Sequence, residues 1–112
     1  MAHELIKHTP FLWQRGPNYL HWCPGCKCGH VYPTKRENGP NWGFNGNVES
    51  PSFTPSMLIY TPIYRNGEPT GERHVRCHYY LTDGQIRYQP DCPHEFSGKT
   101  VPMEPIPDDY GF

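Results

Sequence analysis

Two groups of cysteine and histidine residues are the features of this sequence best suited to chemistry. The first lies in the run His-Trp-Cys-Pro-Gly-Cys-Lys-Cys-Gly-His, in which Pro-Gly separates Cys23 from Cys26. This CxxC spacing lets both sulfurs face one ion, and the Pro-Gly turn lets backbone amides approach them. The second group lies far along the chain and consists of Cys77, His78, Asp91, Cys92 and His94. Two groups of soft ligands in one small chain predict a tetrahedral zinc site that joins them.

The composition predicts a small fold that depends on this metal. A chain of 112 residues makes one domain with a modest core. It contains 11 glycines and 14 prolines, yet 14% of its residues are aromatic, which argues against disorder. We therefore expect a loop-rich fold with an aromatic core, pinned by zinc, whose binding contributes directly to folding.

Charge and hydropathy exclude several classes of partner. Ten basic and 11 acidic residues leave a formal net charge of −1, so no general attraction to nucleic acid or acidic membranes follows. No apolar run is long enough to span a bilayer, and the first residues lack the apolar core of a signal peptide. Five cysteines are an odd number and suit thiolate ligands in a reducing compartment better than disulfides. A soluble, cytoplasmic protein is expected.

Alternation of apolar and polar residues with a period of two predicts a mainly β protein with little helix. Dipeptides such as Asn66-Gly67 and Asp83-Gly84 favour tight turns between the strands. The predicted fold class is a small, zinc-ribbon-like β-sheet domain over residues 1–101, followed by a Pro-rich acidic tail over 102–112. Strands are expected at about 18–23, 30–34, 56–64, 73–82 and 85–89.

The register of the hairpin at 73–90 can be predicted in detail. A two-residue turn at Asp83-Gly84 pairs Tyr79 with Tyr88 and brings Cys77 beside Pro90. Adjacent residues of a strand point to opposite faces, so Cys77 and His78 are not expected to bind the same ion unless a bulge intervenes. The segment that begins at Asp91 then lies within reach of the Cys77 sulfur.

This geometry suggests a ligand set. Cys23, Cys26 and Cys77 are the expected thiolate ligands, and His94 is favoured over Cys92 as the fourth. Three cysteine ligands favour a structural metal over a catalytic one. The other candidates, as alternative ligands or as groups that orient a ligand, are Cys92, His30, His78 and Asp91.

The segment from Trp42 to Ser56 contains no metal ligand and no recognisable catalytic pair. It is interpreted as a structured loop whose aromatic residues cover the core. The sequence also lacks an HExxH motif and the His-x-Glu of zinc deaminases. No catalytic residue is therefore predicted.

Five ordered motifs carry a resemblance to a known family. They are Cys-Pro-Gly-Cys, Trp-x-Phe-Asn-Gly, Pro-Ser-Phe-Thr-Pro-Ser, Cys-His-x4-Asp-Gly-x-Ile and Asp-x2-His-x3-Gly-x-Thr-Val, within residues 20–103. The chain resembles a family of small phage and prophage proteins without known function, sometimes labelled "ammonia monooxygenase". The resemblance implies a phage or prophage origin and zinc bound by Cys23, Cys26, Cys77 and His94. The label itself conflicts with a thiolate-rich site and the lack of a spanning segment.

The functional hypothesis from the sequence is a phage-encoded zinc-binding accessory protein that acts as a protein-interaction module. Its expected partner is a host or phage protein, in the cytoplasm of the infected bacterium or within the virion. Two alternatives remain: a zinc-dependent hydrolase with an open metal position, and a module that binds single-stranded nucleic acid. Nothing in the sequence sets an oligomeric state.

Overall fold

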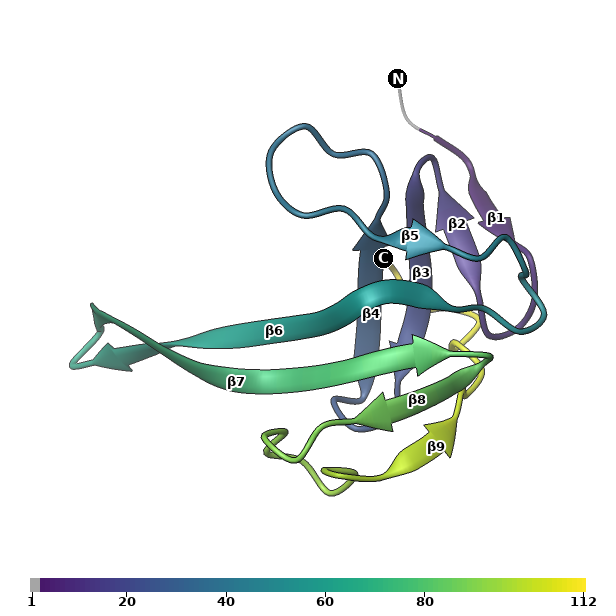
Figure 1. Ribbon diagram of the computed structural model, residues 1–112. Helices are drawn as coiled ribbons and strands as arrows, with labels where there is room; N and C mark the ends of the chain where they lie inside the picture. The colour runs from purple at the N-terminus through teal and green to yellow at the C-terminus, as the bar shows by residue number, and fades with distance from the viewer. Residues whose placement is uncertain (1–2) are drawn as a thin grey trace.

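The computed structural model describes residues 3–112, and every regular element in that range is a β-strand. Two antiparallel sheets form the fold (Figure 1). The first contains, in spatial order, β1 (Leu5–Lys7), β2 (Trp13–Arg15), β3 (Asn18–Cys23) and β4 (Cys28–Pro33). The second contains β5 (Gly43–Phe44), β6 (Phe53–Arg65), β7 (Glu68–Thr82), β8 (Gln85–Tyr88) and β9 (Thr100–Pro102). The prediction of a mainly β protein is confirmed; its zinc-ribbon character stays a prediction. No helix able to cross a membrane is found among these residues.

The predicted register of the β7–β8 hairpin is confirmed. Thr82 pairs with Gln85 and Tyr79 with Tyr88. Both residues of the turn have positive φ, 49° at Asp83 and 73° at Gly84. This combination belongs to the tight hairpin turn that Asp-Gly favours.

The hairpin formed by β6 and β7 is longer than the sequence indicated. The two strands run far beyond the rest of the second sheet and form a projecting ribbon (Figure 1). Its tip is the Asn66-Gly67 turn, where φ is 51° and 79°. β5 pairs with only the beginning of β6, and β8 pairs with only the end of β7. The body of the protein therefore surrounds one end of the ribbon.

Aromatic side chains fill the space between the sheets, as the composition predicted. Tyr32 of the first sheet stacks on Phe53 of the second, with ring centroids 4.2 Å apart and an interplanar angle of 2°. Tyr79 is fully buried beside them. Such stacked and edge-to-face pairs add to the energy of apolar burial.

The segment after β9 packs on the outer face of the first sheet. Ile106 is buried there against Trp13 and Leu20. The backbone N–H of Gly29 donates to the Tyr110 hydroxyl at 2.9 Å, and Arg15 donates to the carbonyl of Phe112 at 3.0 Å. Both faces of the first sheet are thus covered.

Candidate active site and metal centre

The β3–β4 hairpin ends in the Cys-Pro-Gly-Cys turn. Cys23 pairs with Cys28 at the end of the ladder, and Lys27 closes the turn with φ of 55° and a 2.8 Å hydrogen bond from its N–H to the Cys23 carbonyl. The N–H of Cys26 approaches the Cys23 sulfur at 3.3 Å. The turn therefore brings a backbone amide toward a sulfur, as expected for a metal knuckle.

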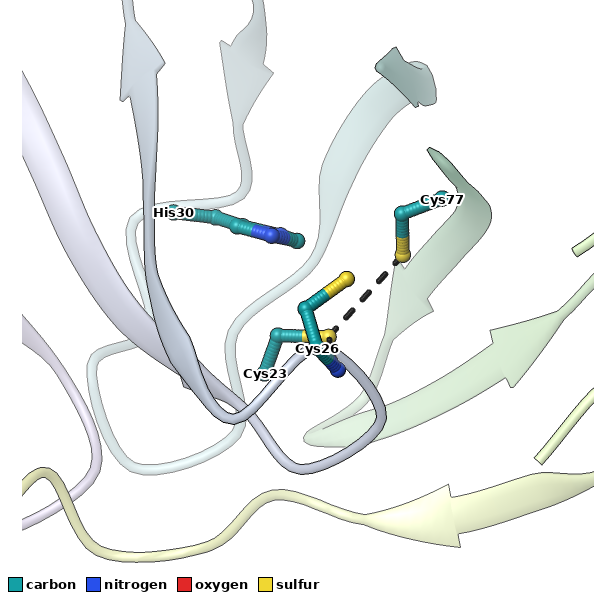
Figure 2. A group of neighbouring side chains, drawn as sticks. All are labelled: Cys23, Cys26, His30 and Cys77. Atoms are coloured by element: carbon teal, nitrogen blue, oxygen red, sulfur yellow. Dashed lines mark hydrogen bonds between the residues drawn. The ribbon is translucent and has the colours of Figure 1, made fainter. Parts of the chain in front are cut away.

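Four side chains from both sheets meet at this turn. The potential ligand atoms of Cys23, Cys26, His30 and Cys77 all lie within 4.8 Å of one another. We call these four residues the metal cluster (Figure 2). The Cys23 and Cys77 sulfurs are 3.9 Å apart, although 54 residues separate them in sequence. The cluster is positioned to bind a metal ion and would crosslink the two sheets.

Hydrogen bonds within the cluster favour a thiolate at Cys23. The pKa of Cys23 is lowered because the Cys26 and Cys77 thiols direct their protons to its sulfur. The same bond raises the pKa of Cys26 to about 12, and the pKa of Cys77 also rises because it donates to Cys23. The Tyr88 hydroxyl is a further donor at 3.0 Å. A metal ion would displace the shared protons and take their place between the sulfurs.

A buried chain of hydrogen bonds orients the histidine of the cluster. His21 Nδ1 lies 3.3 Å from the Trp22 carbonyl and is therefore the donor, so Nε2 of His21 accepts from the Tyr79 hydroxyl at 2.7 Å. The Tyr79 oxygen in turn accepts from Nδ1 of His30 at 3.0 Å. This pattern leaves the lone pair of His30 Nε2 available for a metal. Burial lowers the pKa of His30 and keeps the imidazole neutral.

A second group, consisting of Cys77, Cys92 and His94, shares one sulfur with the metal cluster. His94 Nε2 lies 3.6 Å from the Cys77 sulfur. The N–H of Phe96 donates to His94 Nδ1 at 3.3 Å, so the ring proton belongs on Nε2 and points to Cys77. The His94 ring also packs directly on Gly25.

The opposite face of β7 carries a different arrangement. His78 Nε2 lies 3.3 Å from the Ser56 hydroxyl, and His78 Nδ1 lies 3.0 and 3.1 Å from the two carboxylate oxygens of Asp91. Serine and aspartate thus contact different nitrogens of one imidazole. This is the order of contacts in Ser-His-Asp hydrolases, whose serine hydrogen bond is often loose without substrate.

An irregular register positions Ser56. Phe53 pairs with Leu81 and Met57 with Tyr79, so four steps along β6 oppose two along β7. The resulting bulge lies between Phe53 and Met57 and includes Ser56. Met57 and Tyr79 are buried, and Ser56 and His78 next to them face the other way. The indole N–H of Trp42 donates to the Ser56 carbonyl at 3.3 Å and holds this segment.

Cys92 holds His78 and Asp91 in position. Its sulfur accepts from the backbone N–H of His78 at 3.0 Å and donates to the His78 carbonyl at 3.0 Å. Beyond the end of β8, the Gln89 N–H also donates to this carbonyl, at 2.9 Å. Because Asp91 precedes Cys92, this contact sets the carboxylate beside the imidazole.

These positions change two sequence-based interpretations. The segment ending at Ser56 is no mere structural loop, because Ser56 contacts a histidine that is itself bound to a carboxylate. Asp91, considered as an alternative metal ligand or as a group that orients a ligand, contacts His78. The sequence contained one signal for this second site. Because Cys77 and His78 were predicted to point to opposite faces, His78 was left outside the metal site and available for another role. The expected assignment of His94 as fourth ligand stays a prediction.

The comparisons with known proteins identify a protease family. A model of the family described as bacterial ubiquitination-like system serine protease (BubE) matches residues 3–89, which include Ser56 and His78 but not Asp91. No curated protein and no solved structure gave a significant match. The hypothesis of a phage zinc accessory protein that acts as an interaction module is wrong, because the matched family is a protease family. Since the match covers most of the 112 residues, the chain belongs to the BubE family of serine proteases.

Proposed function

We propose that this protein is a serine peptidase of a bacterial ubiquitination-like system, with Ser56 as nucleophile, His78 as general base and Asp91 as the group that orients the base. The observation that carries the proposal is the contact of Ser56 and Asp91 with opposite nitrogens of His78. The His78 side chain is 24% exposed and that of Asp91 49%, so a polypeptide can reach the site. The family description supports a protein of that system as the substrate.

The geometry suits acyl transfer. Ser56 Oγ attacks the carbonyl carbon of an amide while its proton passes to His78 Nε2. Asp91 accepts the hydrogen bond from Nδ1–H and stabilises the resulting imidazolium. The tetrahedral intermediate collapses as His78 gives the proton to the leaving amine, which leaves an acyl ester on Ser56. Water then attacks the ester, again with His78 as base, and releases the carboxylic acid and free serine.

The metal in this proposal is zinc, and its role is structural. Three thiolates and one imidazole are a common closed zinc ligand set. When bound, the ion would neutralise the thiolate charge and lock the two sheets together through Cys77. Because His78 follows Cys77 on the same strand, this lock would also fix the base. Ser56 supplies the nucleophile, so the chemistry requires no metal-bound water.

For the fourth ligand we propose His30. Its Nδ1 donates to Tyr79 and its Nε2 is free, as in zinc sites whose ligating histidine is held by a second hydrogen bond. His94 would instead donate its Nε2–H to the Cys77 thiolate. Zinc content of His30→Ala and His94→Ala proteins decides between them. If zinc is lost from His30→Ala but kept by His94→Ala, His30 is supported as the fourth ligand. If zinc is lost from His94→Ala but kept by His30→Ala, the prediction from sequence is supported.

A fluorophosphonate probe tests the peptidase proposal directly, because it reacts preferentially with an activated serine hydroxyl. We expect labelling of the wild-type protein at Ser56, identified by peptide mass spectrometry, and none in Ser56→Ala or His78→Ala. Ser52→Ala is the matched control from the same motif. Its hydroxyl accepts from the Asp83 N–H at 2.8 Å and contacts no histidine, so its loss should leave labelling intact. Labelling absent from Ser56 in the folded, zinc-loaded wild type would refute the proposal.

A further inference from the structure

A hollow on the second sheet lies beside the Ser56–His78–Asp91 arrangement. It has a volume of about 220 Å³ and is lined by Tyr80, Thr82, Gln85, Arg87 and Thr100. These residues come from β7, β8 and β9, where Tyr80 pairs with Arg87 and Arg87 with Thr100. Tyr80 and His78 are two residues apart on β7, so they point to the same face. The hollow and the triad therefore open on one surface.

Arg87 gives this hollow a positive charge. Its side chain is exposed, and no carboxylate partner for it is found among residues 3–112. The nearby acid Asp91 is bound to His78, and Asp83 accepts from the Ser52 hydroxyl at 3.4 Å. None of the five lining residues is acidic. An anionic group that enters the hollow would therefore contact a guanidinium that neither Asp83 nor Asp91 already binds.

The guanidinium is also held in place. Its central carbon lies 5.3 Å from the centroid of the Tyr80 ring, a cation–π contact. An arginine fixed by an aromatic ring loses less side-chain freedom on binding, and its planar donors match a carboxylate. Tyr80 thus links the charged residue to the strand that carries the base.

We infer that the Tyr80–Arg87 hollow is a substrate subsite that binds a carboxylate of the polypeptide being cleaved. The inference rests on the proposed peptidase function. Tyr80 lies roughly 7 Å from His78 along β7, and Arg87 lies two strand spacings, about 10 Å, from β6. An extended peptide advances about 3.3 Å per residue. The carboxylate therefore belongs to a residue within about three positions of the cleaved bond, as an acidic side chain or a chain terminus.

The test measures how short peptides protect Ser56 from fluorophosphonate labelling, so no cleavage is required. Three acetylated, amidated pentapeptides of alanine carry Glu, Gln or Lys at the central position. We expect half-maximal protection at about tenfold lower concentration for the Glu peptide than for the Gln peptide. The preference should disappear in Arg87→Gln and turn toward Lys in Arg87→Glu. Pentaalanine with a free or an amidated C-terminus shows whether a terminal carboxylate also binds.

Arg65→Gln is the matched control, because Arg65 is an exposed arginine at the distant tip of the ribbon. It should keep the preference for the Glu peptide. Equal protection by the Glu and Gln peptides, with no advantage for a free C-terminus, overturns the subsite while labelling of Ser56 still supports the peptidase. A preference that persists in Arg87→Gln also overturns it. Absence of labelling at Ser56 overturns the proposed function and the subsite with it.

Discussion

Replacing Tyr79 by phenylalanine tests the connection between the metal cluster and the aromatic core. Tyr79 is fully buried, and its hydroxyl bonds His21 at 2.7 Å and His30 at 3.0 Å. Phenylalanine keeps the ring and its packing. The change therefore removes two hydrogen bonds and little else.

The expected cost follows from the burial of the partners. His21 is 0% and His30 6% exposed, so water cannot easily replace the lost hydroxyl. Each buried polar group left without a partner costs about 1–3 kcal/mol. Because the buried hydroxyl itself is also removed, we expect a total at the low end, about 2–3 kcal/mol. For a domain of this size that lowers Tm by roughly 10–15 °C.

Urea unfolding with the metal present measures this loss, provided that the slope of free energy against denaturant is unchanged. Competition with a chelator measures zinc affinity, which should fall about 10- to 100-fold because His30 loses the group that orients it. Tyr64→Phe is the matched control, since Tyr64 is 59% exposed. If the Tyr79 and Tyr64 variants unfold within about 0.5 kcal/mol of each other, the two hydrogen bonds do not hold the site and the argument fails.

Three other changes have defined outcomes. Asp91→Asn should lower kcat by about 10²- to 10⁴-fold, because an amide favours the wrong tautomer of His78, while zinc content stays the same; retained activity would remove Asp91 from the triad. Cys92→Ala should loosen the His78 backbone and lower the rate of fluorophosphonate labelling about tenfold with zinc retained, and loss of zinc would instead identify Cys92 as a ligand. Gly25→Ala should lower Tm and zinc affinity, because its Cβ would lie 2.4 Å from the His94 ring; thermal unfolding and chelator competition identical to wild type would show that the ring moves freely.

Local pattern was sufficient to predict part of the fold. The alternation in 73–90 and the Asp83-Gly84 turn gave the correct register, because cross-strand pairing in a tight hairpin depends on neighbours in sequence. β3 was predicted with its observed bounds, 18–23. β1, β2, β5 and β9 were not predicted, since strands of two or three residues are too short for a period to be visible.

The site was harder to predict because its parts are distant in sequence. Ser56 and His78 meet only through the β6–β7 ladder, and the bulge before Met57 cannot be seen in the residue pattern. His30 reaches the metal cluster because β4 pairs with β3, whereas the predicted hairpin and the family resemblance favoured His94 as the fourth ligand, which stays a prediction. Residue types therefore indicated a metal site, while the serine arrangement required the pairing of whole strands.

The alternation of Cys77 and His78 along β7 has a consequence for how this sequence can change in evolution. β7 carries Cys77 of the metal cluster on its inner side and His78, the proposed general base, on its outer side, one position apart. A single-residue insertion or deletion between Cys77 and the Asp83 turn would reverse every side chain that follows it in β7, and a change before Tyr79 would also separate Tyr79 from its histidines. At the Asn66-Gly67 tip, insertions of equal length in β6 and β7 would only lengthen the ribbon. Relatives should therefore vary in length at the tip and keep constant spacing from Cys77 to Asp83.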